Sequence, residues 1–305
     1  MKAVRIHEFG GPEVLKLEDI ALPVLKPGEL LIKVAGAGIN PVDYKIRQGG
    51  YPKVTQAQLP ITLGRDVAGV VQISGDQYKV GEEVYALLDW TLGGYAEFAV
   101  VAAANCAYKP ASLSLRDSGA VPLAALTAWQ GVFDHGGLRA GQRILIHGGA
   151  GGVGHFAVQF AKSSDAYVAT TVSARDTEFV RALGADMIID RNAQRFEDVA
   201  KDMDVVFDLV GGDTRARSWG VLKRGGILVS TLGQPDTAHA HSLGVRAAGY
   251  TAQPSAAQLT QIRERLDTAR VKVVISRAFT LAEAAQAHRY LEQEHPRGKV
   301  VFAAG

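Results

Sequence analysis

The chain has 305 residues, of which 47% are hydrophobic, and its formal net charge at pH 7 is only +2. This length is sufficient for two domains with separate cores. Runs of five like charges and stretches of eighteen apolar residues are both absent, which argues against a nucleic-acid footprint, a polybasic membrane patch and a membrane-spanning helix.

The first 122 residues have the pattern of short strands separated by Gly, Pro and Asp. The chain begins with a predicted strand entering a turn, without an apolar signal core, so we expect a cytoplasmic location. Segments rich in Val, Ile, Leu and aromatic residues follow at 30–39, 67–73, 82–88 and 95–101. This part is predicted to be an irregular β-barrel or sandwich. The single cysteine, Cys106, excludes an internal disulfide and is expected to be buried near a strand end.

From Leu123 onward, helical and strand patterns alternate. A helix is predicted at 124–133, and strands follow at 143–148, 167–172, 187–190, 203–210 and 226–232. Such alternation predicts an α/β fold with a parallel sheet and right-handed crossovers. After Gly249 come two amphipathic helices and two short strands, the last of which indicates that the tail returns to the first domain. We therefore predict one domain from 1–122 and 250–305, and a second at 123–249.

A glycine-rich turn joins the strand at 143–148 to the next helix. Its glycines at 149, 151 and 154 have the GxGxxG spacing, where side chains would block the turn, the approach of a pyrophosphate or close helix packing. The unpaired N–H groups at the start of the helix then face the phosphates. The residues predicted to bind the dinucleotide here are Gly149, Ala150, Gly151, Gly152, Val153 and Gly154.

The residues after the second strand of this domain indicate which dinucleotide binds. Sites for NAD place an acidic residue there to accept hydrogen bonds from ribose hydroxyls, but this chain has Ser173. Ser173 can donate to a 2′-phosphate and Arg175 can supply charge and a planar fork of donors, so NADPH is favoured over NADH. Ser173 and Asp176 also have the spacing of a capping box for the following helix, and the two roles are compatible.

Nine motifs, in this order, span the chain: GPEVL (11–15), GINPVDYKIRQG (38–49), PITLGRDVAGVV (60–71), VGEEVYAL (80–87), GGYAEFAVV (93–101), LTAWQGVFDHGGLRAGQRILIHGGAGGVG (126–154), LGAD (183–186), VVFDLVGG (205–212) and RGKVVF (297–302). Their order and spacing resemble the zinc-free quinone oxidoreductase branch of the medium-chain dehydrogenase/reductase family. The resemblance implies a GroES-like catalytic domain from both chain ends and a Rossmann NADP(H)-binding domain between them. It also implies two-electron reduction of quinones or of conjugated enals and enones by NADPH, in a homodimer paired through the Rossmann sheet edge near 245–250.

The resemblance also identifies positions where a metal is missing. In the zinc alcohol dehydrogenases that this family resembles, Cys, His and Glu ligands hold the catalytic metal at places that are Asn40, Arg65 and Asp66 here. An amide and a guanidinium are not zinc ligands, and the arginine repels a cation. We therefore expect no metal. Without a Lewis acid, the substrates should be acceptors that take hydride unaided, and alcohol oxidation is not expected.

By the same resemblance, Asn40, Asp43 and Tyr44 lie in the segment that lines the nicotinamide side of the site. The amide of Asn40 or the hydroxyl of Tyr44 could stabilise an enolate oxygen, and Tyr44 is the better proton donor, although solvent could serve as well. The alternative is that Asp43 pairs with Arg65 to stabilise the loop and that Tyr44 only packs.

Further cofactor contacts are predicted, each with a structural alternative. By resemblance, the hydroxyl of Thr127 meets the cofactor near the nicotinamide, or else it bonds a preceding helical carbonyl. Arg191 reaches the 2′-phosphate or stacks on adenine, or is a solvated surface residue. Val210, Gly211 and Gly233 end strands at the edge where open α/β sheets bind ligands. His147 has no partners at metal or triad spacing and is predicted to be structural.

The substrate is expected to be a small planar quinone or conjugated carbonyl compound, with no nucleic-acid or membrane partner. Substrate specificity is expected to depend on residues 51–59, Trp90 and residues 235–241, but the sequence of these segments does not identify the acceptor. A second class stays open: a non-catalytic NADPH-binding sensor or structural protein, because relatives of this branch include lens crystallins. A fold with a cofactor site does not by itself prove turnover.

Overall fold

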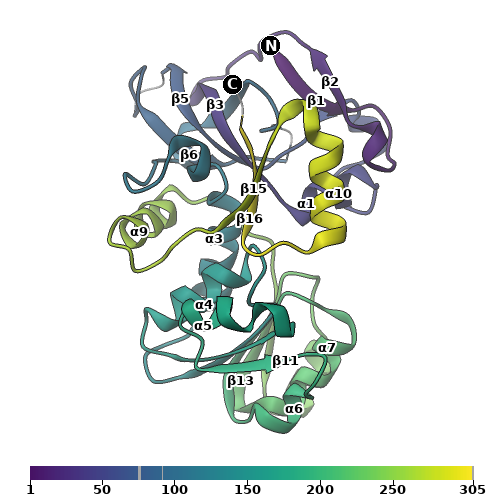
Figure 1. The fold of residues 1–305 in the computed structure, drawn as a ribbon, viewed down its shortest axis with the longest axis vertical. Coiled ribbons are helices and arrows are strands. Elements are labelled where there is room, and N and C mark those ends of the chain that lie inside the picture. Colours follow the sequence, from purple (N-terminus) through teal and green to yellow (C-terminus); the bar gives the residue numbers. More distant parts are fainter. Residues whose placement is uncertain (75–76, 91, 304–305) are drawn as a thin grey trace. The chain divides into compact units, whose positions relative to one another are not determined.

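The structure is a computed structural model that describes residues 1–74, 77–90 and 92–303 (Figure 1). It divides into two compact units. Unit 1 comprises Met1–Ala124, Gln253–Ala269 and Val273–Gly305, and unit 2 comprises Ala125–Ala252 and Arg270–Lys272. The boundaries predicted from the sequence were 122/123 and 249/250. Residues 75, 76, 91, 304 and 305 of the predicted barrel domain lie outside the described residues.

Unit 1 is built mainly from antiparallel strands in two sheets. The larger sheet has the order β15 (Ile275–Thr280), β16 (Lys299–Ala303), β3 (Glu29–Ile39), β5 (Asp66–Ile73), β6 (Glu83–Leu87) and β8 (Cys106–Tyr108), and β7 (Phe98–Ala102) also pairs with β3. The smaller sheet has the order β2 (Lys16–Asp19), β1 (Lys2–Ile6) and β4 (Ile61–Thr62). Because β16 pairs antiparallel with β3, the tail of the chain shares a sheet with the N-terminal strands.

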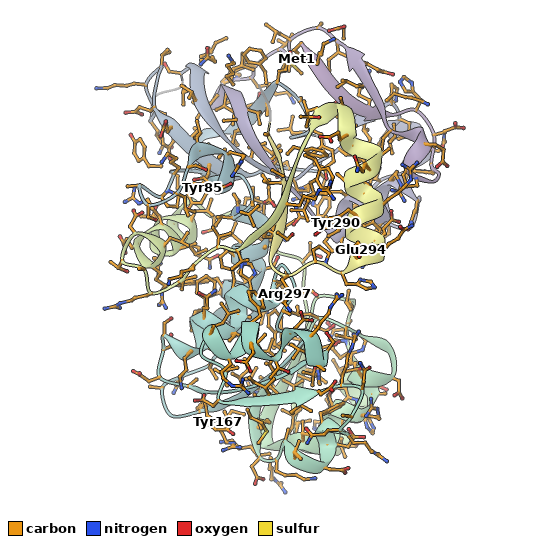
Figure 2. The ribbon with its side chains drawn as sticks, viewed as in Figure 1. Met1, Tyr85, Tyr167, Tyr290, Glu294 and Arg297 are labelled. Atoms are coloured by element: carbon orange, nitrogen blue, oxygen red, sulfur yellow. The ribbon has the colours of Figure 1, made fainter. Side chains whose placement is uncertain are left out.

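Helices and side chains close the core of unit 1. Its helices are α1 (Pro41–Arg47), α2 (Leu115–Ser118), α9 (Ala256–Asp267) and α10 (Ala284–Glu294). Tyr85 on β6, labelled in Figure 2, is fully buried and its hydroxyl donates to the carbonyl oxygen of Leu259 on α9, at 2.6 Å. Cys106 is fully buried at the start of β8, as predicted. The aliphatic segments recognised in the sequence therefore form one packed barrel core.

Unit 2 contains a six-stranded parallel sheet. Its strand order is β11 (Met187–Asp190), β10 (Tyr167–Val172), β9 (Arg143–His147), β12 (Met203–Asp208), β13 (Leu222–Ser230) and β14 (Arg246–Gly249). Counted along this unit the order is 3-2-1-4-5-6, the arrangement of dinucleotide-binding folds. The predicted α/β fold is confirmed.

The remaining helices precede or connect these strands. They are α3 (Pro122–Trp129), which continues as a π-helix over Gln130–His135, α4 (Gly154–Lys162), α5 (Thr177–Ala182), α6 (Phe196–Val199), α7 (Gly212–Arg217) and α8 (Thr237–Ser242). Short 3₁₀ turns lie at Pro12–Val14, Gln56–Gln58, Ala103–Asn105, Ala174–Asp176, Ser218–Val221 and Leu281–Glu283. Among the described residues, no helix has both the length and the apolar character needed to cross a bilayer.

The short return of the chain to unit 2 at Arg270–Lys272 has a local cause. The side-chain amide of Gln159 donates to the carbonyl oxygen of Lys272 at 3.0 Å, and the N–H of Lys272 donates back to Gln159 Oε1 at 2.8 Å. A buried glutamine on α4 therefore pairs with the backbone as a neighbouring strand would. No sequence pattern marks this contact.

Candidate functional site

The glycine loop lies where the strand order of unit 2 reverses. This switch point falls between β9 and β12, and open α/β sheets bind ligands outside the carboxyl ends of the strands at such a point. The loop after β9 runs directly into α4, which begins at Gly154. Backbone N–H groups at the start of α4 are therefore placed for an anion, as the sequence predicted.

The three glycines of the motif do different things. A Cβ atom on Gly149 would lie 2.1 Å from Thr170 Oγ1, and one on Gly154 would lie 2.1 Å from the carbonyl oxygen of Gly148. On Gly151 a Cβ would meet only that Gly148 oxygen, at 3.5 Å. Protein packing thus requires glycine at 149 and 154, whereas the space beside Gly151 fits the close approach of a pyrophosphate.

His147 is a buried side chain next to the loop. It is fully buried, and its two ring nitrogens lie 3.0 Å from Thr171 Oγ1 and 2.9 Å from Ser218 Oγ. Burial lowers the pKa of His147 to about 4, so the ring is neutral near pH 7. The geometry fits the structural role predicted for it.

The two residues proposed to read the 2′-phosphate follow β10 directly. Ser173 Oγ donates to Asp176 Oδ2 at 2.5 Å, and Arg175 Nε lies 3.7 Å from the same carboxylate oxygen. The Arg175 side chain is 59% exposed. The predicted capping box does not form through Ser173, because its hydroxyl donates to the carboxylate and does not accept a backbone N–H. Ser173 and Arg175 are nevertheless adjacent to one another at the end of β10.

Asp208, the last residue of β12, organises two loops that the sequence predicted to contact the cofactor. Its Oδ1 accepts from the N–H groups of Val210 and Gly211 at 3.0 and 2.7 Å, and its Oδ2 accepts from Ser230 Oγ at 2.9 Å. Val210 is 47% exposed. A Cβ on Gly233 would meet nothing within 4 Å, so open space lies beside it too. Asp208 was not predicted from the sequence, although a carboxylate at the end of an apolar strand could have indicated its role in the loop.

Two other predicted cofactor contacts are less distinctive. Thr127 is 8% exposed, and its carbonyl oxygen accepts a hydrogen bond from the hydroxyl of Tyr250. Arg191 is exposed, and its backbone N–H donates to the carbonyl oxygen of Val172 at 2.9 Å. Their roles toward the cofactor stay predictions.

In unit 1, strand pairing gathers six polar residues that we call the buried polar cluster: Asn40, Asp43, Arg65, Asp66, Tyr95 and Lys299. The antiparallel register of β16 and β3 pairs Val300 with Ile39, which sets Lys299 opposite Asn40. Lys299 is 3% exposed, its Nζ donates to Asn40 Oδ1, and it lies 3.6 Å from Asp66 Oδ2. Burial lowers the pKa of Lys299, and Asp66 opposes that effect.

The amide of Asn40 is committed within this cluster. Its Nδ2 donates to Asp66 Oδ2 at 2.8 Å and to the carbonyl oxygen of Gly38 at 3.3 Å. A side-chain amide has only two N–H donors, so none is left for a substrate oxygen. The enolate-stabilising role predicted for Asn40 does not fit this geometry. The residue instead connects α1 to β5.

Asp43 is a buried carboxyl with an unusual proton affinity. It is fully buried, and its Oδ2 accepts from the N–H of Asn40 and from the Tyr95 hydroxyl, both at 2.7 Å. Burial raises the pKa of Asp43 to about 7, against the lowering effect of these hydrogen bonds. Within the described part of the chain, no hydrogen bond or ion pair joins Asp43 to Arg65, so the predicted structural pairing is not seen.

Tyr44 keeps its proton near neutral pH. It is half-buried on α1, and burial together with the negative charge of Glu292 raises the pKa of its hydroxyl. No hydrogen bond occupies this hydroxyl among the described residues. The geometry therefore leaves the predicted proton-donor role possible for Tyr44, and that role stays a prediction.

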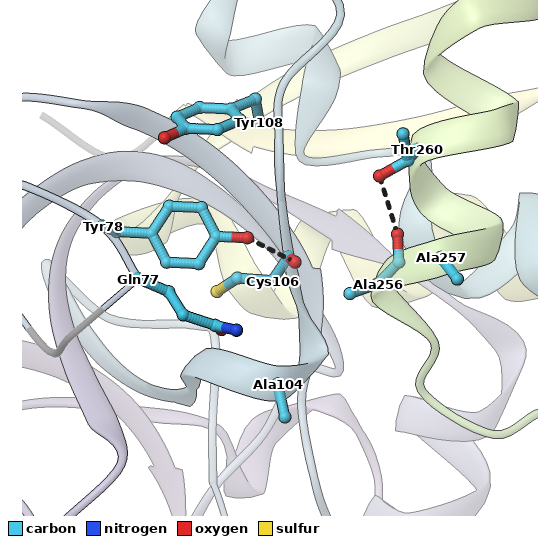
Figure 3. A pocket seen from close by; sticks show the side chains of 8 residues that line it. All are labelled: Gln77, Tyr78, Ala104, Cys106, Tyr108, Ala256, Ala257 and Thr260. Carbon is cyan, nitrogen blue, oxygen red and sulfur yellow. Dashed lines mark hydrogen bonds between the residues drawn. The ribbon is translucent and has the colours of Figure 1, made fainter.

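A pocket of about 530 Å³ elsewhere in unit 1 is a separate feature (Figure 3). The Tyr78 hydroxyl donates to the carbonyl oxygen of Cys106 at 2.7 Å on its wall. Burial raises the pKa of the Cys106 thiol to about 12, which leaves it unreactive near pH 7. The lining contains none of the predicted site residues: it is formed by Gln77, Tyr78, Ala104, Cys106, Tyr108, Ala256, Ala257 and Thr260.

Known proteins are similar to this chain in sequence and in fold. Residues 26–111 match the alcohol dehydrogenase GroES-like domain, and residues 183–302 match the zinc-binding dehydrogenase family. The chain is 33% identical to the mitochondrial NAD(P)H oxidoreductase RTN4IP1 of Danio rerio, over 99% of this chain and 91% of that protein. It is 36% identical to the chloroplastic NADPH-dependent alkenal/one oxidoreductase of Arabidopsis thaliana, over 99% and 79%.

A solved structure agrees over the same length. The quinone oxidoreductase from Coxiella burnetii superposes with a TM-score of 0.92 at 35% identity, and the match covers 99% of each chain. The resemblance inferred from the nine motifs is confirmed. The chain belongs to the zinc-free quinone oxidoreductase branch of the medium-chain dehydrogenase/reductase family.

Proposed function

We propose that this protein is an NADPH-dependent reductase that transfers two electrons to quinones or to the C=C bond of conjugated enals and enones. The observation that carries the proposal is the glycine loop at the switch point, where Gly149 and Gly154 are packed and Gly151 leaves open space. The printed names of the Arabidopsis and Coxiella relatives, an alkenal/one oxidoreductase and a quinone oxidoreductase, support the same reaction class.

NADPH, when bound, supplies the hydride, and the chain supplies binding, position and electrostatics. The residues that would hold it are the glycine loop, Ser173 and Arg175 after β10, and the backbone of the loops that Asp208 organises. Tyr44 retains a proton that a reduced acceptor requires, and water is the other source.

We propose that the reaction proceeds without zinc. The positions equivalent to zinc ligands in the related alcohol dehydrogenases hold Asn40, Arg65 and Asp66, and Lys299 adds a second buried cation that contacts both Asn40 and Asp66. A guanidinium and an ammonium group at this place oppose a divalent cation, and the amide oxygen of Asn40 is already occupied. The residues present therefore do not fit a zinc ion. An acceptor that takes hydride without a Lewis acid suits such a site.

Cofactor preference can be tested at Arg175. We expect Arg175→Ala to weaken NADPH binding by about 1–3 kcal/mol, because a charge-assisted contact to the 2′-phosphate is lost, and to leave NADH binding nearly unchanged. Fluorescence titration with both cofactors measures the two dissociation constants. Arg181→Ala, which removes an exposed arginine of α5 that pairs with Glu178, is the matched control. Equal losses for NADPH and NADH in Arg175→Ala would contradict the assignment.

Turnover separates the reductase from a non-catalytic NADPH-binding protein. We expect NADPH absorbance to fall when the protein meets at least one member of a panel of ortho-quinones, para-quinones, alkenals and enones. Tight NADPH binding without oxidation of NADPH above the buffer rate by any acceptor would favour the sensor or structural role. Preference for an acyclic enal over every quinone would assign the protein to the alkenal reductases.

We also propose a homodimer paired through β14. This strand ends the sheet of unit 2, and within the described part of the chain it pairs only with β13. An open strand edge is a ready template for pairing with a second copy. The cytoplasmic location expected from the sequence stays a prediction.

A further inference from the structure

Arg65 is buried with most of its hydrogen-bond donors unused. The residue is 3% exposed, and its Nε donates to the carbonyl oxygen of Leu88 at 2.7 Å. Its Nη1 is buried without a partner, and Nη2 has no hydrogen bond within the described part of the chain. Each terminal guanidinium nitrogen carries two N–H donors, so the two on Nη1 are buried without an acceptor. Desolvating them without replacement bonds is costly.

Arg47, in the same unit, shows how this protein satisfies a structural arginine. It is fully buried, yet its Nε donates to the carbonyl oxygen of Gly10 at 3.1 Å. Its Nη1 and Nη2 donate to the two carboxylate oxygens of Glu292 at 3.1 and 3.0 Å, and Nη1 also lies 3.1 Å from His288 Nδ1. Burial of Arg65 without comparable partners therefore points to an acceptor from outside the protein.

The neighbouring carboxylates do not supply that acceptor. Asp66 Oδ1 accepts from the N–H of Leu123, and Oδ2 accepts from Asn40 and faces Lys299. Asp66 thus pairs with Lys299, whereas Arg65 makes no hydrogen bond or ion pair with Asp43 or Asp66 among the described residues and feels these carboxylates only through longer-range electrostatics.

An aromatic platform stands beside these unused donors. The guanidinium carbon of Arg65 lies 3.4 Å from the ring centroid of Trp90, and Tyr51 stacks on Trp90 with ring centroids 4.7 Å apart and planes inclined by 25°. Tyr51 and Trp90 belong to the segments from which the sequence predicted substrate choice. Arg65 and Tyr51 thus cover the two faces of Trp90, so a flat, conjugated molecule that carries an oxygen acceptor would lie against the edge of this stack.

We propose that Arg65 binds the carbonyl oxygen of the acceptor and stabilises the negative charge that develops there during reduction, with Tyr51 and Trp90 holding the planar part of the molecule. This inference rests on the proposed function and assigns its oxyanion donor. For an enone, the hydride pair forms a C–H bond at the β-carbon while the C=C π pair shifts toward oxygen, and NADPH becomes NADP⁺. The enolate oxygen is held by Arg65 until the α-carbon takes a proton from Tyr44 or water. For a quinone, the same charge appears on the hydroquinone oxygen before it is protonated.

The first test compares Arg65→Met with the matched control Arg47→Met in steady-state kinetics. We expect Arg65→Met to lower kcat about 100-fold or more, as loss of an oxyanion donor does, with NADPH affinity within about threefold of wild type. Arg47→Met should unfold at a lower temperature yet keep kcat within about threefold when folded, because its partners are all internal. An Arg65→Met enzyme with wild-type kcat would overturn the proposal.

The second test measures ligand affinity in the absence of turnover, so its result is valid even if no acceptor on the panel is reduced. Calorimetric titration uses benzoate as a planar anion and benzamide as its neutral counterpart. We expect Arg65→Met to bind benzoate about 10- to 100-fold more weakly than wild type, and benzamide within about threefold. Equal benzoate affinity in the two proteins would refute the assignment. A wild-type protein that binds benzoate through Arg65 but reduces nothing would instead defeat only the proposed function.

Should Arg65→Met fail to fold, Arg65→Lys decides the question. Lysine keeps the charge but loses the planar fork, so kcat and benzoate affinity should both fall, by about tenfold, in a folded protein. Unchanged values in folded Arg65→Lys, confirmed by circular dichroism and NADPH binding, would count against the proposal.

Discussion

Replacing Gly151 by valine is expected to weaken NADPH binding at least 100-fold while the protein remains folded. A Cβ at this position makes only an ordinary contact, 3.5 Å from the carbonyl oxygen of Gly148, so the fold tolerates it. The added isopropyl group fills the open space where the pyrophosphate would approach the backbone. We expect the melting temperature of Gly151→Val to stay within a few degrees of wild type, and fluorescence titration to show at least a 100-fold loss of NADPH affinity, about 2.8 kcal/mol.

Gly154→Ala is the matched control, in which a smaller side chain is expected to destabilise the fold. Its Cβ would lie 2.1 Å from the Gly148 oxygen and 2.8 Å from the Gly149 Cα, and these are backbone atoms that cannot rotate away. Overpacking of this kind costs about 1–3 kcal/mol or more, so urea unfolding should show a lower midpoint. Wild-type NADPH affinity in Gly151→Val, or an unchanged urea midpoint in Gly154→Ala, would contradict this assignment of the loop.

The stability of the wild-type protein is expected to include a contribution from Asp43 that falls as the pH rises from about 4 to about 7. In the folded protein, burial raises the pKa of this carboxyl from 3.8 to about 7. Between these values the folded state binds the proton and the unfolded state does not, so a rising pH favours unfolding by up to about 1.4 kcal/mol for each pH unit. The contribution is present in full below the unfolded pKa and is lost as the pH passes the folded pKa.

Asp43→Asn isolates this effect, because an amide has no proton to lose in this range. Urea unfolding of both proteins at several pH values between 5 and 8 gives the difference between their free energies of unfolding. We expect that difference to shift in favour of Asp43→Asn as the pH rises, whatever other buried groups contribute, since they are common to both proteins. Parallel pH profiles for the two proteins would show that Asp43 does not titrate as its burial implies.

Local patterns predicted the framework of the fold well. The strand at 143–147, the glycine loop and α4 follow from an apolar run, turn residues and helical periodicity, and each is a property of neighbouring residues. The order of the parallel sheet then follows from alternating strands and helices with right-handed crossovers. Cofactor-loop residues could therefore be named from the sequence, because the motif itself is local.

The buried polar cluster could not be predicted in the same way. Lys299 meets Asn40 across 259 positions of sequence, and their pairing depends on the register between β16 and β3. The sequence identified Asn40 as a donor, and it identified Arg65 as a residue that excludes zinc or pairs with Asp43, not as a substrate-binding residue. The structure shows the reverse, since both amide donors of Asn40 are used internally and the Nη1 donors of Arg65 are not. Hydrogen-bond satisfaction is a tertiary property that residue type does not reveal.

Zinc-free hydride transfer is tested most directly by the stoichiometry of NADPH oxidation with the best acceptor of the panel, measured in the presence of a strong zinc chelator. We expect one NADPH to be oxidised for each quinone or enone reduced, giving hydroquinone or saturated carbonyl product, at the same rate with and without chelator. Loss of activity on chelation would contradict a zinc-free site, and two molecules of acceptor reduced per NADPH would contradict two-electron hydride transfer.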